Sequence, residues 1–355
     1  MPSNGSSEDL GAIFRRLIRN TGPISLTQFM GESNARYYSS RDPLGTGGDF
    51  VTAPEISQMF GELIGLWAAD MWIQAGRDDY VQYVELGPGR GTLAKDVLRA
   101  GAKYGFAPQV HFIESSTTLR QEQAKAVPQA HFHHDLSTLP TDVPLVFVAN
   151  EFLDALPVRQ LVKAGAGWRE RKVGLEGEAF VFVAGEQPMD AAVPANWLDA
   201  PEGTILETCP GAAATVYEVA GRLTQQGGAA LFIDYGHARL QAGSTLQAVR
   251  AHRKIDPFEA PGEADLTALV EFETLARIAE SRDARHLGTV EQGAWLKALG
   301  IEARAQALAA RAPHYASEIH EAMQRLIAPE QMGRLFKVMG LAGLGWPGGA
   351  GFSGD

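Results

Sequence analysis

The feature that most constrains the fold is a glycine-rich turn that joins an apolar strand to a helix. Residues 80–86 have the apolar pattern of a strand, Gly87, Gly89 and Gly91 follow at alternate positions, and a helical pattern begins at Leu93. Glycine permits a positive φ and lets a ligand approach the backbone closely. The first N–H groups of the helix, which lack partners within it, then line the ligand site. The sequence therefore predicts an α/β fold that binds a ligand at this turn.

The residues around the turn indicate which ligand binds there. A dinucleotide-binding turn requires a third small residue at the position of Thr92, and a phosphate-binding P-loop requires Gly-Lys-Ser or Gly-Lys-Thr, which is absent. Glu85 stands two residues before the first glycine, where its carboxylate would repel a pyrophosphate but suits a ligand with an ammonium group. S-adenosylmethionine (SAM) is such a ligand. An ordinary structural turn between strand and helix is the alternative interpretation.

A second carboxylate supports the prediction of SAM. Glu114 ends a short apolar strand at residues 110–113, 23 residues after Gly91, where it can accept both ribose hydroxyls. With Glu85 and the three glycines, it makes the turn resemble motif I of the class I SAM-dependent methyltransferases. Asp135, after the third strand, is expected near the adenine. The predicted cofactor-binding residues are Glu85, Gly87, Pro88, Gly89, Gly91, Glu114, Asp135 and Asn150.

Composition narrows the class of protein. The 355 residues are 45% hydrophobic and 21% charged, which allows one large α/β domain with additions or two domains. Acids outnumber bases by 42 to 31, and the net charge of -11 argues against a nucleic-acid substrate. The single cysteine, Cys209, indicates a reducing compartment. With no apolar run of membrane-spanning length and no signal-like start, a bacterial cytoplasmic location is expected, or the mitochondrial matrix in a eukaryote.

The strongest catalytic candidates follow a second buried strand. Residues 143–149 are nearly all apolar, and Asn150, Glu151, Phe152 and Asp154 come directly after them. Because ligands bind at the carboxyl ends of strands in open α/β sheets, we expect Glu151, Asp154 and Asn150 to be catalytic. In the alternative interpretation, Asn150 and Asp154 only cap a turn or helix.

Further candidates lie in a polar segment near the N-terminus and after a later strand. Residues 35–55 are rich in Gly, Tyr, Thr and acids, which is typical of a lid, although a solvated connection is the alternative. Residues 228–234 form another buried strand, which ends in Asp234-Tyr235-Gly236 at the same edge of the sheet. The predicted substrate and lid residues are Tyr38, Asp49, Phe50, Glu55, Phe152, Asp234 and Tyr235.

Three histidines in four residues, His131, His133 and His134, raise the question of a metal site. Neighbouring residues of a strand point to opposite faces, and no Cys or Glu completes a ligand set. The sequence therefore predicts no metal centre.

The expected architecture is a Rossmann-like class I methyltransferase sheet with additions. Residues 1–76 form an N-terminal helical and lid region, and residues 77–240 form the SAM-binding α/β domain, with a β-meander inserted at about 158–200. Residues 241–342 contain a second insertion, helices and a final strand, and the Gly-rich tail 343–355 is expected to be disordered.

Several longer motifs resemble the MidA family of class I SAM-dependent methyltransferases, bacterial relatives of the mitochondrial complex I assembly arginine methyltransferase. The motifs are Tyr37-Tyr38-Ser39, Gly48-Asp49-Phe50 with Pro54-Glu55, residues 85–91, residues 150–157, Asp234-Tyr235-Gly236, Thr245-Leu246-Gln247 and residues 262–267. Leu269 and Glu271 depart from the family pattern, which expects His and Asp there.

The resemblance implies an enzyme that uses SAM to form symmetric dimethylarginine on a subunit of respiratory complex I. In such an enzyme Glu151 and Asp154 would hold the guanidinium and take its proton, with Asn150 orienting them and Phe152 or Tyr38 walling the pocket. A protein substrate is thus the expected partner, and a homodimer is left open. The alternatives are a small-molecule methyltransferase, a SAM-bound assembly factor without catalysis, and an NAD-dependent dehydrogenase, which the turn sequence disfavours.

Overall fold

A computed structural model describes residues 9–40, 52–77, 80–165, 167–251 and 253–352. These residues group into two compact units. The first unit comprises Met1–Pro43, Ala155–Gly211 and Gln241–Leu269, and the second comprises Leu44–Asp154, Ala212–Leu240 and Val270–Asp355. The chain therefore leaves the second unit and returns to it more than once.

The second unit is built on an eight-stranded, mostly parallel sheet. Its strands run in the order β15-β16-β10-β5-β2-β3-β4, and the short β14 pairs with β10. Parallel pairing runs from β10 to β4, and β16 and β15 add antiparallel strands at one edge. The strands are β2 (Gln82–Leu86), β3 (Gln109–Ile113), β4 (His131–His133), β5 (Leu145–Asn150), β10 (Gly228–His237), β14 (Val270–Glu271), β15 (Arg285–Glu291) and β16 (Phe336–Ala342).

The order of the strands places a topological switch point at β2. From β2 the chain moves outward to β3 and β4, and it then returns to pair β5 on the other side of β2. Ligands of open α/β sheets bind outside the carboxyl ends of the strands at such a point. The predicted cofactor turn follows β2 and the predicted catalytic segment follows β5, so both lie at this edge.

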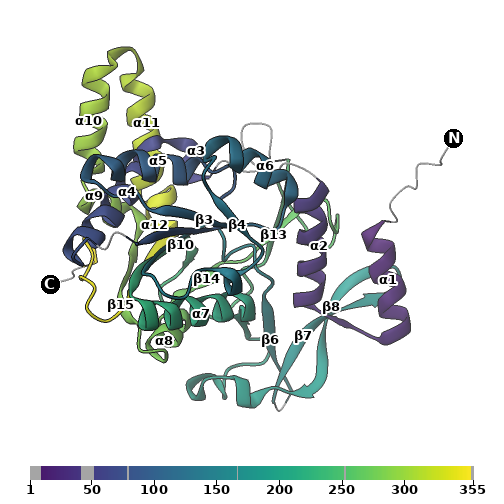
Figure 1. The fold of residues 1–355 in the computed structure, drawn as a ribbon. Helices are drawn as coiled ribbons and strands as arrows, with labels where there is room; N and C mark the ends of the chain where they lie inside the picture. Colours follow the sequence, from purple (N-terminus) through teal and green to yellow (C-terminus); the bar gives the residue numbers. More distant parts are fainter. Residues whose placement is uncertain (1–8, 41–51, 78–79, 166, 252, 353–355) are drawn as a thin grey trace. The chain divides into compact units, whose positions relative to one another are not determined.

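Helices cover both faces of this sheet (Figure 1). Helices α4, α5, α9, α10 and α11 share one apolar core with one face of the strands, and α7 and α8 lie on the opposite face. The helices are α3 (Ala53–Ile56), α4 (Gln58–Gln74), α5 (Thr92–Gly101), α6 (Thr117–Ala126), α7 (Pro210–Gln226), α8 (Phe272–Glu280), α9 (Gln292–Ala298), α10 (Ile301–Arg311), α11 (Ala316–Ile327) and α12 (Met332–Leu335). Short 3-10 helices are η1 (Ala102–Tyr104), η2 (Leu136–Thr138) and η5 (Pro313–Tyr315).

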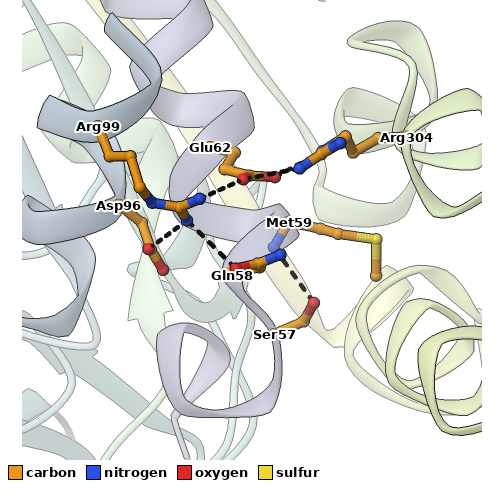
Figure 2. Close-up of polar contacts among 7 residues, drawn as sticks. All are labelled: Ser57, Gln58, Met59, Glu62, Asp96, Arg99 and Arg304. Carbon is orange, nitrogen blue, oxygen red and sulfur yellow. Dashed lines mark hydrogen bonds and ion pairs between the residues drawn. The ribbon is translucent and has the colours of Figure 1, made fainter. Parts of the chain in front are cut away.

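A buried ionic network joins α4, α5 and α10 (Figure 2). Glu62 on α4 is 3% exposed and accepts hydrogen bonds from Arg304 at 2.7 and 2.9 Å and from Arg99 at 2.9 Å. Arg99 also donates to Asp96 at 2.6 Å. Glycines at positions 61 and 65 let α4 approach α5 closely, because a Cβ at Gly65 would lie 2.5 Å from a backbone oxygen. The network therefore ties α5 and α10 to α4.

The first unit contains an antiparallel sheet, a smaller sheet and two long helices. The predicted meander is confirmed, because β6 (Arg159–Ala164), β7 (Gly167–Glu176) and β8 (Ala179–Pro188) pair in sequence. The remaining strands are β1 (Ile24–Ser25) and β9 (Ile205–Thr208) in this sheet, and β11 (Gln247–Arg250), β12 (Arg253–Ile255) and β13 (Asp265–Thr267) in the smaller one. The helices are α1 (Leu10–Thr21), α2 (Leu26–Ser40) and the short η3 (Asp190–Ala192) and η4 (Ala195–Trp197).

Two local features complete the fold. The Ser25 hydroxyl caps α2, since it accepts the N–H of Gln28 at 3.0 Å. The expectation of a disordered tail after residue 342 is wrong for the described residues up to 352. Trp346 and Phe352 are buried there, and the Phe352 ring packs against Trp67 and Trp295 at 6.4 and 6.2 Å. Packing of these aromatic side chains into the core holds the segment in place, although the sequence around them is rich in glycine.

Candidate active site at the carboxyl edge of the sheet

The cofactor turn has the backbone conformation that its glycines predicted. Gly87, Gly89 and Gly91 have φ values of 62°, 54° and 80°, which are left-handed and strained for other residues. Gly91 is the N-cap of α5, so the turn ends at the free N–H groups of that helix. The Gly87 N–H donates to the Ile113 carbonyl at 3.1 Å, which ties the turn to β3. The positive φ values and this hydrogen bond together define the backbone conformation of the turn.

The catalytic segment packs directly on this turn. A Cβ at Gly87 would lie 2.8 Å from Cδ2 of Phe152, so the Phe152 ring occupies the space that a side chain would need. Because Gly87 has no side chain, the glycine turn and the segment after β5 can pack against each other.

Glu85 is a buried carboxylate that fits a cationic ligand. It is 2% exposed, and the Tyr83 hydroxyl donates to its Oε2 at 2.7 Å. Burial raises the pKa of Glu85 to about 8, although the Tyr83 hydrogen bond opposes the rise. No Lys or Arg of the described ranges forms an ion pair with it. An ammonium or sulfonium group placed here would supply the missing positive charge, which is the chemistry of SAM.

Glu114 is held by two donors in a way that suits a ribose. Its Oε1 accepts the N–H of Ser116 at 2.7 Å, and its Oε2 accepts Nε2 of Gln123 at 3.1 Å. Each carboxylate oxygen therefore keeps one lone pair for a ribose hydroxyl. The predicted role of Glu114 agrees with this arrangement.

Asp135 has a local structural role in addition to its predicted one. It is exposed and caps η2, accepting the N–H and the hydroxyl of Ser137 at 2.8 and 2.5 Å. These hydrogen bonds hold the pKa of Asp135 below its ordinary value. Its contact with adenine stays a prediction.

His131 and His133 share one face of β4, as strand alternation implies, and His111 of the neighbouring β3 lies beside them. His111 on β3 and His133 on β4 lie on the same face, with Nδ1 and Nε2 2.9 Å apart, and the His131 ring stacks on His111 at 5.1 Å. Burial, followed by the charges of the other two histidines, lowers the pKa of His111 to about 4. Within the described residues, no group of three or more His, Cys, Asp or Glu is arranged to hold a metal ion.

Glu151 occupies a strained turn at the end of β5. Its φ is 51°, an uncommon value for a residue with a side chain, and such strain concentrates at functional sites. Its Oε1 accepts the N–H of Ala53 at 3.0 Å and Nδ2 of Asn150 at 3.1 Å. Burial raises the pKa of Glu151 to about 7, and these hydrogen bonds oppose the rise. Asn150 therefore holds the Glu151 carboxylate in place, and the catalytic roles of both residues stay predictions.

Asp234 lies beneath the same turn rather than in the position of a substrate contact. It is 1% exposed, and its Oδ2 accepts the N–H groups of Phe152, Leu153 and Asp154 at 3.1, 2.8 and 3.3 Å. Its Oδ1 accepts the Tyr235 N–H at 2.9 Å. Burial and the nearby Glu151 carboxylate raise the pKa of Asp234. The geometry favours a role in shaping the turn over the predicted substrate role.

The other predicted residues are distributed over both units. Asp154 is 8% exposed in the same turn, and the Tyr235 ring packs on Phe336 at 4.1 Å. Glu55 accepts the Thr92 hydroxyl at 2.6 Å, which joins α3 to the start of α5. Tyr38 belongs to the first unit, where its hydroxyl donates to Asp265 at 2.9 Å. Asp49 and Phe50 lie outside the described residues.

Sequence reasoning missed Gln123 and the backbone of Ala53. Gln123 is fully buried on α6, and it interrupts an otherwise apolar stripe that includes Leu119 and Ala126. A polar residue in an apolar stripe is the signal that could have identified it. The Ala53 N–H could not be found this way, because a backbone donor leaves no mark in the sequence.

The glycine turn at the switch point, the buried Glu85 and the Glu114 carboxylate are the features expected of a class I SAM-dependent methyltransferase. The model of a family of S-adenosyl-L-methionine-dependent methyltransferases matches residues 63–290. The chain is 35% identical over 352 residues to the mitochondrial protein arginine methyltransferase NDUFAF7 of Danio rerio, covering 89% of this chain and 83% of the relative. Human NDUFAF7 is 34% identical over 364 residues, with 91% and 81% covered.

A solved structure agrees with these sequence comparisons. The crystal structure of a Burkholderia thailandensis protein bound to S-adenosylhomocysteine superposes with a TM-score of 0.82 at 30% identity, covering 99% of this chain and 97% of that one. The chain belongs to the MidA family of class I methyltransferases, and its cofactor is SAM. The predicted fold class, family and cofactor are confirmed.

Proposed function

We propose that this methyltransferase modifies arginine side chains of a protein, forming symmetric dimethylarginine on a subunit of respiratory complex I or its equivalent. Two NDUFAF7 relatives that cover most of this chain are named protein arginine methyltransferases. The observation that carries the proposal is Glu151, a half-buried carboxylate next to the cofactor turn with one oxygen left for an acceptor. An arginine acceptor requires such a group, because guanidinium remains protonated in proteins.

The two oxygens of Glu151 have different tasks in this proposal. Oε1 already accepts two hydrogen bonds and fixes the carboxylate, whereas Oε2 accepts none from the part of the chain that the structure describes. Oε2 can therefore bind the acceptor guanidinium, and Asp154 supplies the second carboxylate. A carboxyl group whose pKa of about 7 lies near the working pH is also suited to accept a proton.

Methyl transfer requires alignment, exclusion of water and removal of one proton. When bound, SAM would supply the electrophilic methyl group, with neutral S-adenosylhomocysteine as the leaving group. As the acceptor nitrogen forms its bond to the methyl carbon, that nitrogen gives its proton to Glu151. The methylated guanidinium keeps its positive charge and stays paired with Asp154. Phe152, which packs on the turn at Gly87, excludes water from the reacting atoms.

The remaining site residues divide between cofactor and acceptor. The proposed cofactor residues are Glu85, Gly87, Pro88, Gly89, Gly91, Glu114, Asp135 and Asn150. We propose Tyr38, Asp49, Phe50, Glu55 and Tyr235 as substrate or lid residues, and Asp234 as a residue that positions Glu151.

Incubation of the purified chain with methyl-labelled SAM and lysate from cells that lack it tests the proposal. A labelled protein band, with dimethylarginine found by mass spectrometry and symmetric rather than asymmetric, is the expected result. A labelled small molecule would instead identify a metabolite methyltransferase. Absence of label from both fractions, with SAM binding intact, would identify a SAM-bound assembly factor. Glu151→Gln is the matched control for background label.

The location and assembly of the protein are also proposals. We expect a bacterial member to act in the cytoplasm and a eukaryotic one in the mitochondrial matrix, as the names of the mitochondrial relatives indicate for those proteins. The described residues contain no helix with the length and hydropathy needed to traverse a bilayer. A homodimer would be detected by light scattering of the purified chain.

A further inference from the structure

Gln123 connects the two halves of the cofactor site through one side-chain amide. Its Nε2 donates to the Gly89 carbonyl at 2.8 Å and to Oε2 of Glu114 at 3.1 Å. Gly89 belongs to the turn after β2, and Glu114 follows β3, so the two partners come from different loops. Gln123 lies on α6 and is fully buried. One amide group therefore sets the separation of the turn and the carboxylate.

Burying the side-chain amide of Gln123 lowers the stability of the folded protein unless its hydrogen bonds offset the cost. Its Oε1 is buried and accepts no hydrogen bond from the described residues. An unpaired buried oxygen destabilises the folded state, and an apolar side chain of the same size would avoid that cost. Stability alone therefore does not explain a glutamine at position 123. The two donated hydrogen bonds do.

The backbone around Glu114 is already fixed by other groups. Arg120 Nε donates to the Glu114 carbonyl at 2.8 Å, and its NH2 group donates to the His133 carbonyl at 3.0 Å. A Cβ at Gly91 would lie 3.2 Å from Cβ of Ala126, so α6 also packs closely on the turn. With the backbone fixed, the remaining freedom is rotation of the Glu114 side chain, which the Ser116 N–H restrains at Oε1 and Gln123 restrains at Oε2.

We propose that Gln123 is a positioning residue for SAM, which holds the Glu114 carboxylate at a fixed distance from the Gly89 turn. The Glu114 carboxylate, which would bind the ribose, and the Gly89 turn, which would bind the methionine end of SAM, are then already at the correct separation. Preorganisation of this kind increases affinity by lowering the entropic cost of binding. The inference rests on the proposed assignment of Glu114 to the ribose.

Titration calorimetry of the full chain with S-adenosylhomocysteine tests the inference. Gln123→Met keeps the volume and removes both donors, and we expect it to weaken binding about tenfold, as the loss of a hydrogen bond to a charged group implies. The KM for SAM should rise by a similar factor while kcat changes far less. Glu122→Gln, at a half-exposed neighbouring position on α6 where Glu122 pairs with Lys125, is the control and should leave binding unchanged. Gln123→Leu replaces Gln123→Met if the latter does not fold.

A double-mutant cycle with Glu114→Gln separates positioning from a general packing effect. If Gln123 acts through Glu114, Gln123→Met should weaken binding far less in the Glu114→Gln background than in the wild type. An equal loss in both backgrounds, or no loss in the wild type, would overturn the inference while leaving the ribose assignment intact. Unchanged affinity in Glu114→Gln alone would overturn the ribose assignment and the inference with it.

Discussion

The carboxylate of Asp234 holds the backbone of Leu153, whose N–H it accepts at 2.8 Å. The same oxygen accepts the N–H groups on either side, from Phe152 and Asp154. Three consecutive N–H groups that point at one oxygen bend the chain sharply. This bend follows Glu151, the residue with the strained φ of 51°. Asp234 therefore stabilises the conformation that directs Glu151 into the site.

We predict that Asp234→Ala lowers turnover by at least about 100-fold, because a misplaced catalytic group loses its alignment. Binding of S-adenosylhomocysteine should change by less than about threefold, since the cofactor residues are untouched. Loss of the buried acceptor should also lower the free energy of unfolding by roughly 3 kcal/mol. Asp234→Asn keeps one acceptor oxygen and should retain more activity. Steady-state kinetics and denaturant unfolding of both variants provide the measurements. Equal activity of the two variants would argue that the Asp234 hydrogen bonds do not position Glu151.

A second prediction concerns Glu151 itself. Glu151→Gln keeps the size of the side chain and an oxygen that can accept the Ala53 N–H. The amide cannot take a proton from the acceptor, so turnover should fall by about 10³-fold or more, the upper range for loss of general base catalysis. The dissociation constant of S-adenosylhomocysteine, measured by calorimetry, should remain close to that of the wild type. Substantial turnover in Glu151→Gln would transfer the role of proton acceptor to Asp154.

The raised pKa values of Glu85 and Glu151 predict how stability depends on pH without cofactor. Burial raises these pKa values to about 8 and about 7, above an unfolded value of about 4.3. Folding therefore favours the protonated carboxyls, and their stabilising contribution is complete below about pH 4.3 and lost as pH rises through the folded pKa values. Each group can cost up to about 1.4 kcal/mol per pH unit in this range.

Thermal unfolding between pH 5 and 8.5 checks this prediction. The midpoint temperature of the wild type should fall across the range, apart from the contributions of other groups. Glu85→Gln cannot ionise, so its midpoint should fall less steeply. Saturating S-adenosylhomocysteine should also reduce the slope, because its ammonium group would stabilise ionised Glu85. Parallel curves for the wild type and Glu85→Gln would contradict the assigned burial effect.

Features determined by neighbouring residues could be predicted from the sequence. The positive φ of Gly87, Gly89 and Gly91 and the placement of Glu151 at the end of a strand follow from local pattern and strand order. A strand that is buried on both faces, such as residues 145–150, is also visible as an apolar run.

Features that depend on contacts between distant segments could not be predicted. The carboxylate of Asp234 meets N–H groups about 80 residues earlier in the chain, and no sequence pattern marks that pairing. The grouping of residues 155–211 and 241–269 with the N-terminal helices likewise arises from tertiary packing. The tail after residue 342 was predicted to be disordered because it is rich in glycine, but the burial of Trp346 and Phe352 depends on contacts with distant residues.

A further prediction tests the cofactor turn. Gly89→Val places a β-branched side chain at a backbone φ of 54°, which strains the turn, and it fills space that the bound cofactor requires. Binding of S-adenosylhomocysteine should fall below detection in calorimetry. Gly177→Val, at a φ of 62° in a turn of the other unit with no neighbouring atom within 4 Å of a Cβ, controls for backbone strain alone. Wild-type affinity in Gly89→Val would refute the proposed cofactor position.

The last prediction concerns the ionic network around Glu62, drawn in Figure 2. Burial raises the pKa of Glu62, but the hydrogen bonds and charges of Arg304 and Arg99 outweigh it, so the pKa lies below its ordinary value. Removing one member of a buried ion pair typically costs about 3–5 kcal/mol, and the partial exposure of both arginines places Glu62→Ala nearer 2–3 kcal/mol. Arg304→Met should cost less than Glu62→Ala, because Arg99 still neutralises the carboxylate. Denaturant unfolding measures both, with Glu302→Gln on the exposed face of α10 as the control. A larger loss in Arg304→Met would show that Arg304 stabilises α10 through its packing rather than its charge.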